Sequence, residues 1–137
     1  MRTLCFTIPG EPQPWRRARL FKGRHFKDAR TEANQASWAW AAHQALDGAA
    51  PLEGPLSVAI VCRFIAPPSA PKKTRAAMLA GVKRPTKRPD LDNLIKNLDG
   101  LNGVAFADDA QVVQIAASKV YAETAGVDIT IIPLGAA

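Results

Sequence analysis

The sequence has few cysteines, which limits the kinds of fold and site that it can form. Only two, Cys5 and Cys62, occur in 137 residues. Their spacing matches no metal-binding motif. Both lie among apolar residues in segments with the character of strands, so we expect two small buried thiols and no disulfide. A chain of this kind suits a reducing compartment, and we expect a cytoplasmic location.

Long apolar runs are also lacking. No segment is long and apolar enough for a membrane span, and the start of the chain has no secretory-signal pattern. We find no internal repeat and no linker. The length is that of one domain, residues 1–137, which is large enough to form a hydrophobic core.

Positive charge is abundant and is concentrated in two places. The net charge is +6 and the isoelectric point is about 9.8. Residues 16–30, the first basic segment, and residues 72–88, the second basic segment, together hold 14 of the 18 lysines and arginines. A charge run is often only a solvated face, but two runs that flank an acidic motif favour a polyanionic partner.

The acidic motif is the most informative part of the chain. Residues 88–111 contain five of the eight aspartates. Pro89 favours a turn or a helix entry, and the apolar residues that follow have helical spacing, which predicts a short helix over 91–100. Asn102 and Gly103 form a stop signal.

Two interpretations of the aspartates compete. In the first, Asp90 and Asp92 cap the helix, Lys96 pairs with Asp92, and Asp108–Asp109 is a turn. In the second, the carboxylates bind a hard divalent cation such as Mg²⁺, which takes oxygen ligands and sits against substrate phosphate. Spacing alone does not decide between them.

The remaining pattern predicts an α+β domain, a mixed sheet of about four strands with helices packed on one or both faces. Strand 56–65 is apolar on both faces, which predicts a central strand covered on both sides, and the last two strands are interpreted as a hairpin.

Trp15 either anchors a basic loop or stacks on an unpaired base. Lys119, inside an apolar strand, is either an edge-strand charge or a phosphate ligand.

The expected elements are strand 3–8, loop 11–30, a helix capped by Asp28 or Thr31 that runs to about 47, strand 56–65, helix 72–80, helix 91–100, strand 111–121 and strand 127–132.

Three segments carry a resemblance to a known family. They are Arg-Pro-Asp-Leu-Asp-Asn-Leu-Ile-Lys at 88–96, Leu-Asp-Gly-Leu-Asn-Gly-Val at 98–104 and Asp-Asp-Ala-Gln-Val-Val at 108–113. Together they resemble the signature of the RusA family, Holliday-junction-resolving endodeoxyribonucleases that are common in phages and prophages. The amino-terminal and closing strands resemble the family as well, so the resemblance covers nearly the whole chain.

The resemblance implies specific roles. Asp90, Asp92 and Asp109 correspond to metal-binding catalytic carboxylates, and Lys96 corresponds to the catalytic lysine. The implied cofactor is Mg²⁺, with Mn²⁺ as a substitute, and the implied assembly is a homodimer on four-way DNA junctions. The stretch after Lys96 is shorter than the family's pattern, which leaves the roles of Asp99 and Asp108 open.

We expect both basic segments to contact the phosphate backbone and not the bases, because they lie in loops broken by proline and glycine. Two other functions fit the same sequence: a non-catalytic DNA-binding module, and a nuclease that acts on other branched DNA such as forks or flaps. The residues expected to contact DNA are Arg16, Arg17, Arg19, Lys72, Lys73, Lys83, Arg84, Lys87 and Arg88.

Overall fold

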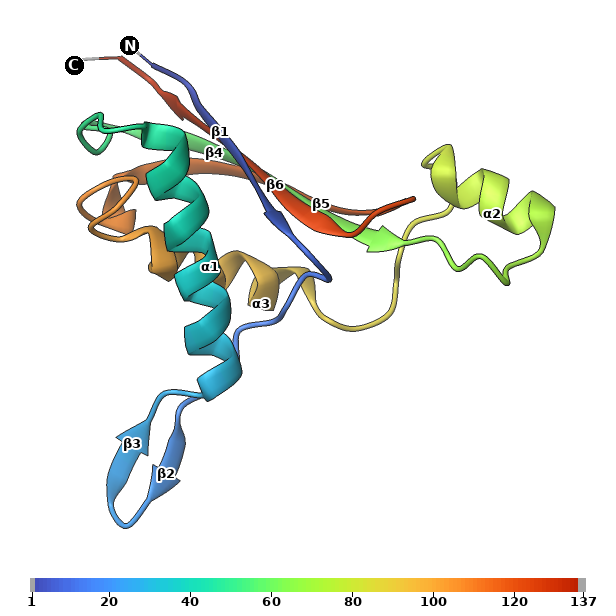
Figure 1. The fold of residues 1–137 in the computed structure, drawn as a ribbon, viewed down its shortest axis with the longest axis horizontal. Coiled ribbons are helices and arrows are strands. Elements are labelled where there is room, and N and C mark those ends of the chain that lie inside the picture. The colour runs from blue at the N-terminus through green and yellow to red at the C-terminus, as the bar shows by residue number, and fades with distance from the viewer. Residues whose placement is uncertain (1, 136–137) are drawn as a thin grey trace.

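The fold is a mixed four-stranded sheet with helices, which confirms the predicted α+β class. The computed structural model describes residues 2–135, except for the side chain of Arg19. The elements, drawn in Figure 1, are β1 (Leu4–Pro9), β2 (Arg19–Phe21), β3 (Arg24–Phe26), α1 (Ala29–Leu46), β4 (Leu56–Ile65), α2 (Lys72–Leu79), α3 (Leu91–Ile95), the 3₁₀ helices η1 (Lys96–Leu101) and η2 (Asp109–Gln111), β5 (Val112–Ala122) and β6 (Gly126–Pro133). Within the described residues, no helix is both long and apolar enough to cross a membrane.

The strands are ordered β1-β6-β4-β5 across the sheet. Strand β4 pairs in parallel with β5 and antiparallel with β6, and β6 pairs antiparallel with β1. The predicted hairpin of the last two strands is therefore wrong, because β4 lies between them. The most apolar strand takes this inner position, where both of its edges are hydrogen-bonded, and the chain between β5 and β6 crosses its end.

Alternation along β4 shows which face of the sheet the helices cover. Leu56, Val58, Ile60 and Cys62 are buried, whereas the residues between them are only half-buried. Side chains from α1 and η1 join the buried set in the core. The prediction that this strand is covered on both sides is thus wrong.

The two cysteines lie on opposite faces of the sheet. Cys62 is buried, and burial raises the pKa of its thiol to about 11. Cys5 is exposed, so the prediction of a second buried thiol is wrong. The reason is the register of β1, in which Leu4 and Phe6 point into the core and Cys5, between them, points away. Both cysteines are free.

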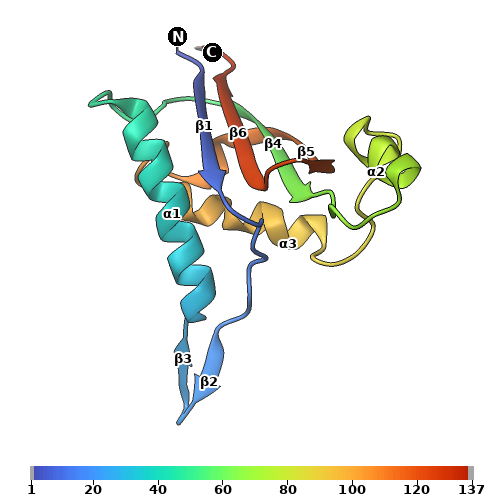
Figure 2. The same cartoon turned by 45° about the vertical axis from the view of Figure 1, so that its right-hand side comes forward.

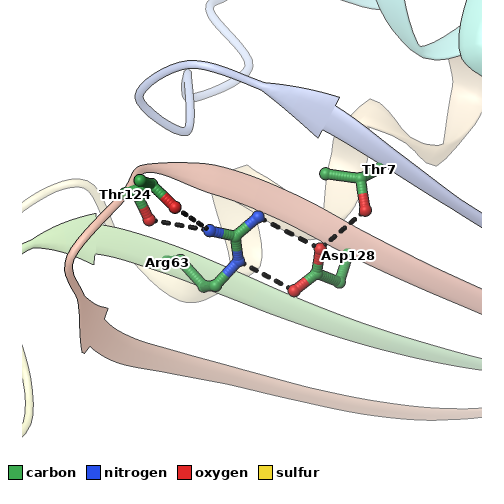
Figure 3. Close-up of polar contacts among 4 residues, drawn as sticks. All are labelled: Thr7, Arg63, Thr124 and Asp128. Carbon is green, nitrogen blue, oxygen red and sulfur yellow. Dashed lines mark hydrogen bonds and ion pairs between the residues drawn. The ribbon is translucent and has the colours of Figure 1, made fainter. Parts of the chain in front are cut away.

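A polar network fixes three strands on the less covered face (Figure 3). The Arg63 guanidinium donates to both carboxylate oxygens of Asp128, at 2.8 and 3.2 Å, and to the carbonyl and hydroxyl oxygens of Thr124. Thr7 donates to Asp128 from β1 at 2.8 Å. Burial pushes the pKa of Asp128 up, but these hydrogen bonds and the guanidinium charge outweigh it and hold that pKa below its usual value. The network ties the crossing between β5 and β6 to β4.

Two basic elements project from this body (Figures 1 and 2). Helix α1 is capped by Asp28, one of the two caps expected, whose side chain accepts hydrogen bonds from the amides of Arg30 and Thr31. Just before it, the expected loop contains a hairpin, β2–β3, that was not predicted. Its two-residue turn is Lys22–Gly23, both with positive φ, which is the geometry that a tight hairpin requires. The second projection is α2, which lies beyond the end of the sheet.

Candidate active site

The acidic motif forms one helical segment along the sheet. It begins as α3 and continues as η1, so the helix predicted over 91–100 is present but tightens after Ile95. Leu94, Leu98 and Leu101 are buried in the core. Asp92, Lys96 and Asp99 consequently face solvent.

Gly100 lets this segment approach α1 closely. A Cβ atom at this position would lie only 2.8 Å from Cβ of Gln35 and 2.9 Å from its carbonyl oxygen. Asn97 adds a hydrogen bond of 2.8 Å to the carbonyl of Gln13. The backbone that carries Asp99 is thus fixed against α1.

The carboxylates at the start of the segment are free. Asp90 occupies the N-cap position of α3, but its side chain makes no capping hydrogen bond. Among the side chains that the structure describes, none pairs with Asp90 or Asp92, and both residues are exposed. The interpretation in which these two residues only cap and pair is therefore wrong.

Lys96 is held by neighbours other than an aspartate. Its ammonium donates to Oδ1 of Asn93 at 3.2 Å and lies 5.0 Å from the centroid of the Trp15 ring. The Trp15 amide in turn donates to the carbonyl of Asn93 at 2.8 Å. Trp15 thus anchors its loop to α3, one of the two roles considered for it, and places an aromatic face beneath the lysine.

A cavity lies beside this group. It has a volume of about 490 Å³ and is lined by Pro14, Trp15, Arg16, Arg88, Pro89, Asp90 and Asn93. Two arginines and a free carboxylate therefore face one hollow, which is suited to a phosphate group together with a cation.

Asp108 has a structural role that the sequence left open. Its carboxylate caps η2 by accepting from the amide of Ala110, which lowers its pKa, and Gln111 completes a capping box. Gln111 also donates to the carbonyls of Leu52 and Gly54, each at 3.1 Å. The turn interpretation was thus right for Asp108, and the capping arrangement fixes the position of the next residue, Asp109.

Asp109 faces other carboxyl groups. A hydrogen bond to the side chain of Asp99, followed by one to Asp108, partial burial and repulsion from both charges, raises the pKa of Asp109 to about 6. Lys96, Asp99 and Asp109 line one cavity of about 250 Å³. Sequence reasoning did not assign Asp99, although its helical spacing from Lys96 places both on one face.

Comparison with known proteins identifies the family. Residues 9–132 match the family described as Endodeoxyribonuclease RusA. The chain belongs to the RusA family. A relative in Bacillus subtilis (strain 168), the uncharacterized protein YqaN, is 41% identical over 61 residues, which are 44% of this chain and 43% of that protein.

The RusA signature residues do not form one cluster in a single chain. Among the described residues, no group of three or more histidine, cysteine, aspartate or glutamate side chains is arranged to hold a metal ion. The structure brings Asp109 to Asp99 and Lys96, and it brings Asp90 to Arg16 and Arg88. The joint site of Asp90, Asp92 and Asp109 stays a prediction.

The cations of this RusA chain lie on either side of α3. The hairpin carries much of the first basic segment, and α2 with the loop after it carries the second (Figure 2). The side chain of Arg19 lies outside the described structure. The other predicted contacts are exposed, as binding to a phosphate backbone requires: Arg16, Arg17, Lys72, Lys73, Lys83, Arg84, Lys87 and Arg88.

Proposed function

We propose that this chain is a Mg²⁺-dependent endodeoxyribonuclease that resolves four-way DNA junctions by phosphodiester hydrolysis, in recombination and repair. The observation that carries the proposal is the set of carboxylates without cationic partners in the RusA motif. Among the described side chains none forms an ion pair with Asp90 or Asp92, and the charged groups that raise the pKa of Asp109 are Asp99 and Asp108, although the chain as a whole is basic. Structural aspartates on a basic protein would be expected to find cations.

The donor chemistry fits a hard cation. Asp90, Asp92 and Asp109 offer oxygen ligands of the kind that Mg²⁺ and Mn²⁺ take in proteins, and the pKa of Asp109 near 6 leaves it ionised at neutral pH. When bound, such an ion lowers the pKa of water and neutralises charge on the phosphodiester.

The chain's own residues supply binding and orientation. Lys96, held over Trp15 by Asn93, would bind a non-bridging oxygen of the scissile phosphate and stabilise the charge that develops there. Arg16 and Arg88, on the wall of the Asp90 cavity, would bind the neighbouring phosphate. The two basic segments then bind the flanking duplex arms through their phosphates.

We further propose a homodimer. A four-way junction has approximate two-fold symmetry, so a C₂ dimer presents two active sites to two opposed strands.

A cleavage panel tests the proposed function. Four-way junctions, forks, flaps and linear duplexes would be incubated with the protein in Mg²⁺, and in parallel with EDTA. We expect cuts in the junction with Mg²⁺ and none with EDTA. Cuts chiefly in forks or flaps would show that the substrate is another branched DNA and not the four-way junction. Tight junction binding with no cut in Mg²⁺ or Mn²⁺ would mean a non-catalytic DNA-binding module.

A further inference from the structure

The hairpin β2–β3 is held at its base and exposed along its length. The amide of Arg16, before β2, donates to the hydroxyl of Thr31 at 2.8 Å, and the side chain of Asp28, after β3, caps α1. Both arms of the hairpin are therefore fixed to the start of α1. Beyond that base, every described side chain from Arg17 to Lys27 is exposed, and the hairpin projects from the body in both views (Figures 1 and 2).

The register of the hairpin places two phenylalanines on one face. Phe21 pairs with Arg24, and Phe26 lies two residues beyond Arg24 on the same strand, so these three side chains share a face. Leu20 and its partner His25 lie on the other face. Phe21 is 61% exposed and Phe26 is 50% exposed. A hairpin of two strands is marginally stable by itself, so the two rings are not explained by a core that they help to form.

Positive charge surrounds the two rings. The ammonium of Lys22 lies 5.5 Å from the centroid of the Phe21 ring, and Lys27 follows Phe26 directly. The stretch 16–27 contains no acidic residue. Cations that contact phosphates, together with aromatic rings on which bases stack, are the means by which proteins bind unpaired nucleic acid. In a duplex the faces of the bases are covered by their neighbours, so such rings can stack on bases only where the strands part.

The hairpin also continues the surface of the candidate active site. Arg16 lines the cavity that contains Asp90, and together with Phe26 and Lys27 it lines another cavity, of about 370 Å³, at the base of the hairpin. Each strand of the hairpin has three residues, so its tip lies roughly 10 Å beyond that base. A DNA strand that leaves the Asp90 cavity along Arg16 therefore meets Phe26 first and Phe21 after it.

We propose that the hairpin β2–β3 enters the branch point of the DNA, where Phe21 and Phe26 stack on unpaired bases while the cations beside them bind the adjoining phosphates. The inference rests on the proposed function, because it takes branched DNA as the substrate. It names the element that distinguishes a branch point from linear duplex. Stacking on the two rings offsets the cost of leaving bases unpaired, and linear duplex offers no such bases.

DNA binding in EDTA tests the proposal without cleavage. Phe21→Leu and Phe26→Leu keep apolar volume and remove the ring. We expect each to weaken binding to a single strand, and to a junction with unpaired bases at its centre, by about tenfold, and to leave binding to linear duplex unchanged. The salt dependence of binding should stay the same, because no phosphate contact is lost. Phe21→Tyr keeps a ring and should bind like the unaltered protein.

Leu20→Ala is the matched control, because Leu20 is also apolar and exposed but lies on the opposite face. It should bind all three DNAs like the unaltered protein. As an independent readout, a photoreactive uracil placed at the unpaired centre of the junction should cross-link to a peptide that contains Phe21 or Phe26.

Leucine variants that bind single strands and junctions as tightly as the unaltered protein would overturn the proposal. An equal loss on linear duplex would overturn it as well, because it would show that the rings contact paired DNA. The proposed function fails separately: if the unaltered protein cut no DNA in Mg²⁺ or Mn²⁺, that function would fall, while a ring-dependent preference for unpaired bases in EDTA would still support the role of the hairpin.

Discussion

The carboxyl pair of Asp99 and Asp109 offers a test of the site that requires neither DNA nor metal. The hydrogen bond that protonated Asp109 donates to the Asp99 side chain is the largest cause of the raised pKa of Asp109. Asp99→Asn keeps the size of the side chain and removes its charge. We therefore expect the pKa of Asp109 to fall from about 6 toward the ordinary value of 3.8.

The size of this effect is easy to detect. With a pKa of about 6, half of the molecules carry a proton on Asp109 at pH 6. An aspartate with an ordinary pKa would carry it in fewer than about one molecule in a hundred at that pH. Because the folded state raises the pKa of Asp109, this group stabilises the folded state fully below about pH 4. That contribution to stability is lost as the pH rises to about 6. The Asp99→Asn protein should lack that decline.

Carbon-13 NMR titration of the aspartate carboxyl groups between pH 3 and 8 measures the pKa directly. Asp47→Asn, at the end of α1 and absent from the groups that perturb Asp109, is the matched control and should leave the midpoint near 6. A midpoint that stays near 6 in the Asp99→Asn protein would refute the carboxyl contact. Junction cleavage should also decline as the pH falls through the Asp109 midpoint, because a protonated carboxyl binds cations poorly.

Three further predictions concern DNA binding, the loop before the motif and the sheet. Neutralising the exposed cations of the second basic segment should reduce the slope of log binding constant against log salt concentration by about one for each cation that binds a phosphate. An unchanged slope would mean that the segment is only solvated surface. Lys119→Met should make trypsin cut after Lys87 about tenfold faster, because the charged hydrogen bond to that carbonyl is removed. Cutting after Lys83 is the internal control. If the variant and the unaltered protein are cut after Lys87 at the same rate, Lys119 does not hold the loop. Arg63→Met should lower the free energy of unfolding by about 1–2 kcal/mol, since its hydrogen bonds are partly exposed. An unchanged free energy of unfolding in denaturant would mean that the network does not stabilise the sheet.

Most of the local structure followed from the sequence. Two candidate caps, Asp28 and Thr31, marked the start of α1, and an apolar run bounded by turn residues marked β4 as a strand. The hairpin β2–β3 did not follow, because its strands have only three residues each. Strand order did not follow, because a short connection is compatible both with a hairpin and with a crossing over one strand. What decided it was the burial of β4 between β5 and β6.

The sequence proposed the residues of the candidate site but not their arrangement. The motif pointed to the carboxylates and to Lys96, whose side chain lies over Trp15. Helical spacing put Asp99 on the face of Lys96, yet nothing in the chain indicated that Asp109 would pack opposite it. That contact depends on how η2 meets η1, which is a tertiary feature.

The central claim is that the motif aspartates perform chemistry and do not hold the fold, and the most direct test is Asp92→Asn. This substitution keeps the shape of an exposed side chain that has no partner in the described part of the chain. Junction binding and junction cleavage would be measured side by side in Mg²⁺. We predict that cleavage collapses while binding persists or tightens, because a charge that repels phosphate is removed. Retained cleavage, or binding and cleavage that fall in step together with a lower unfolding midpoint, would contradict the account.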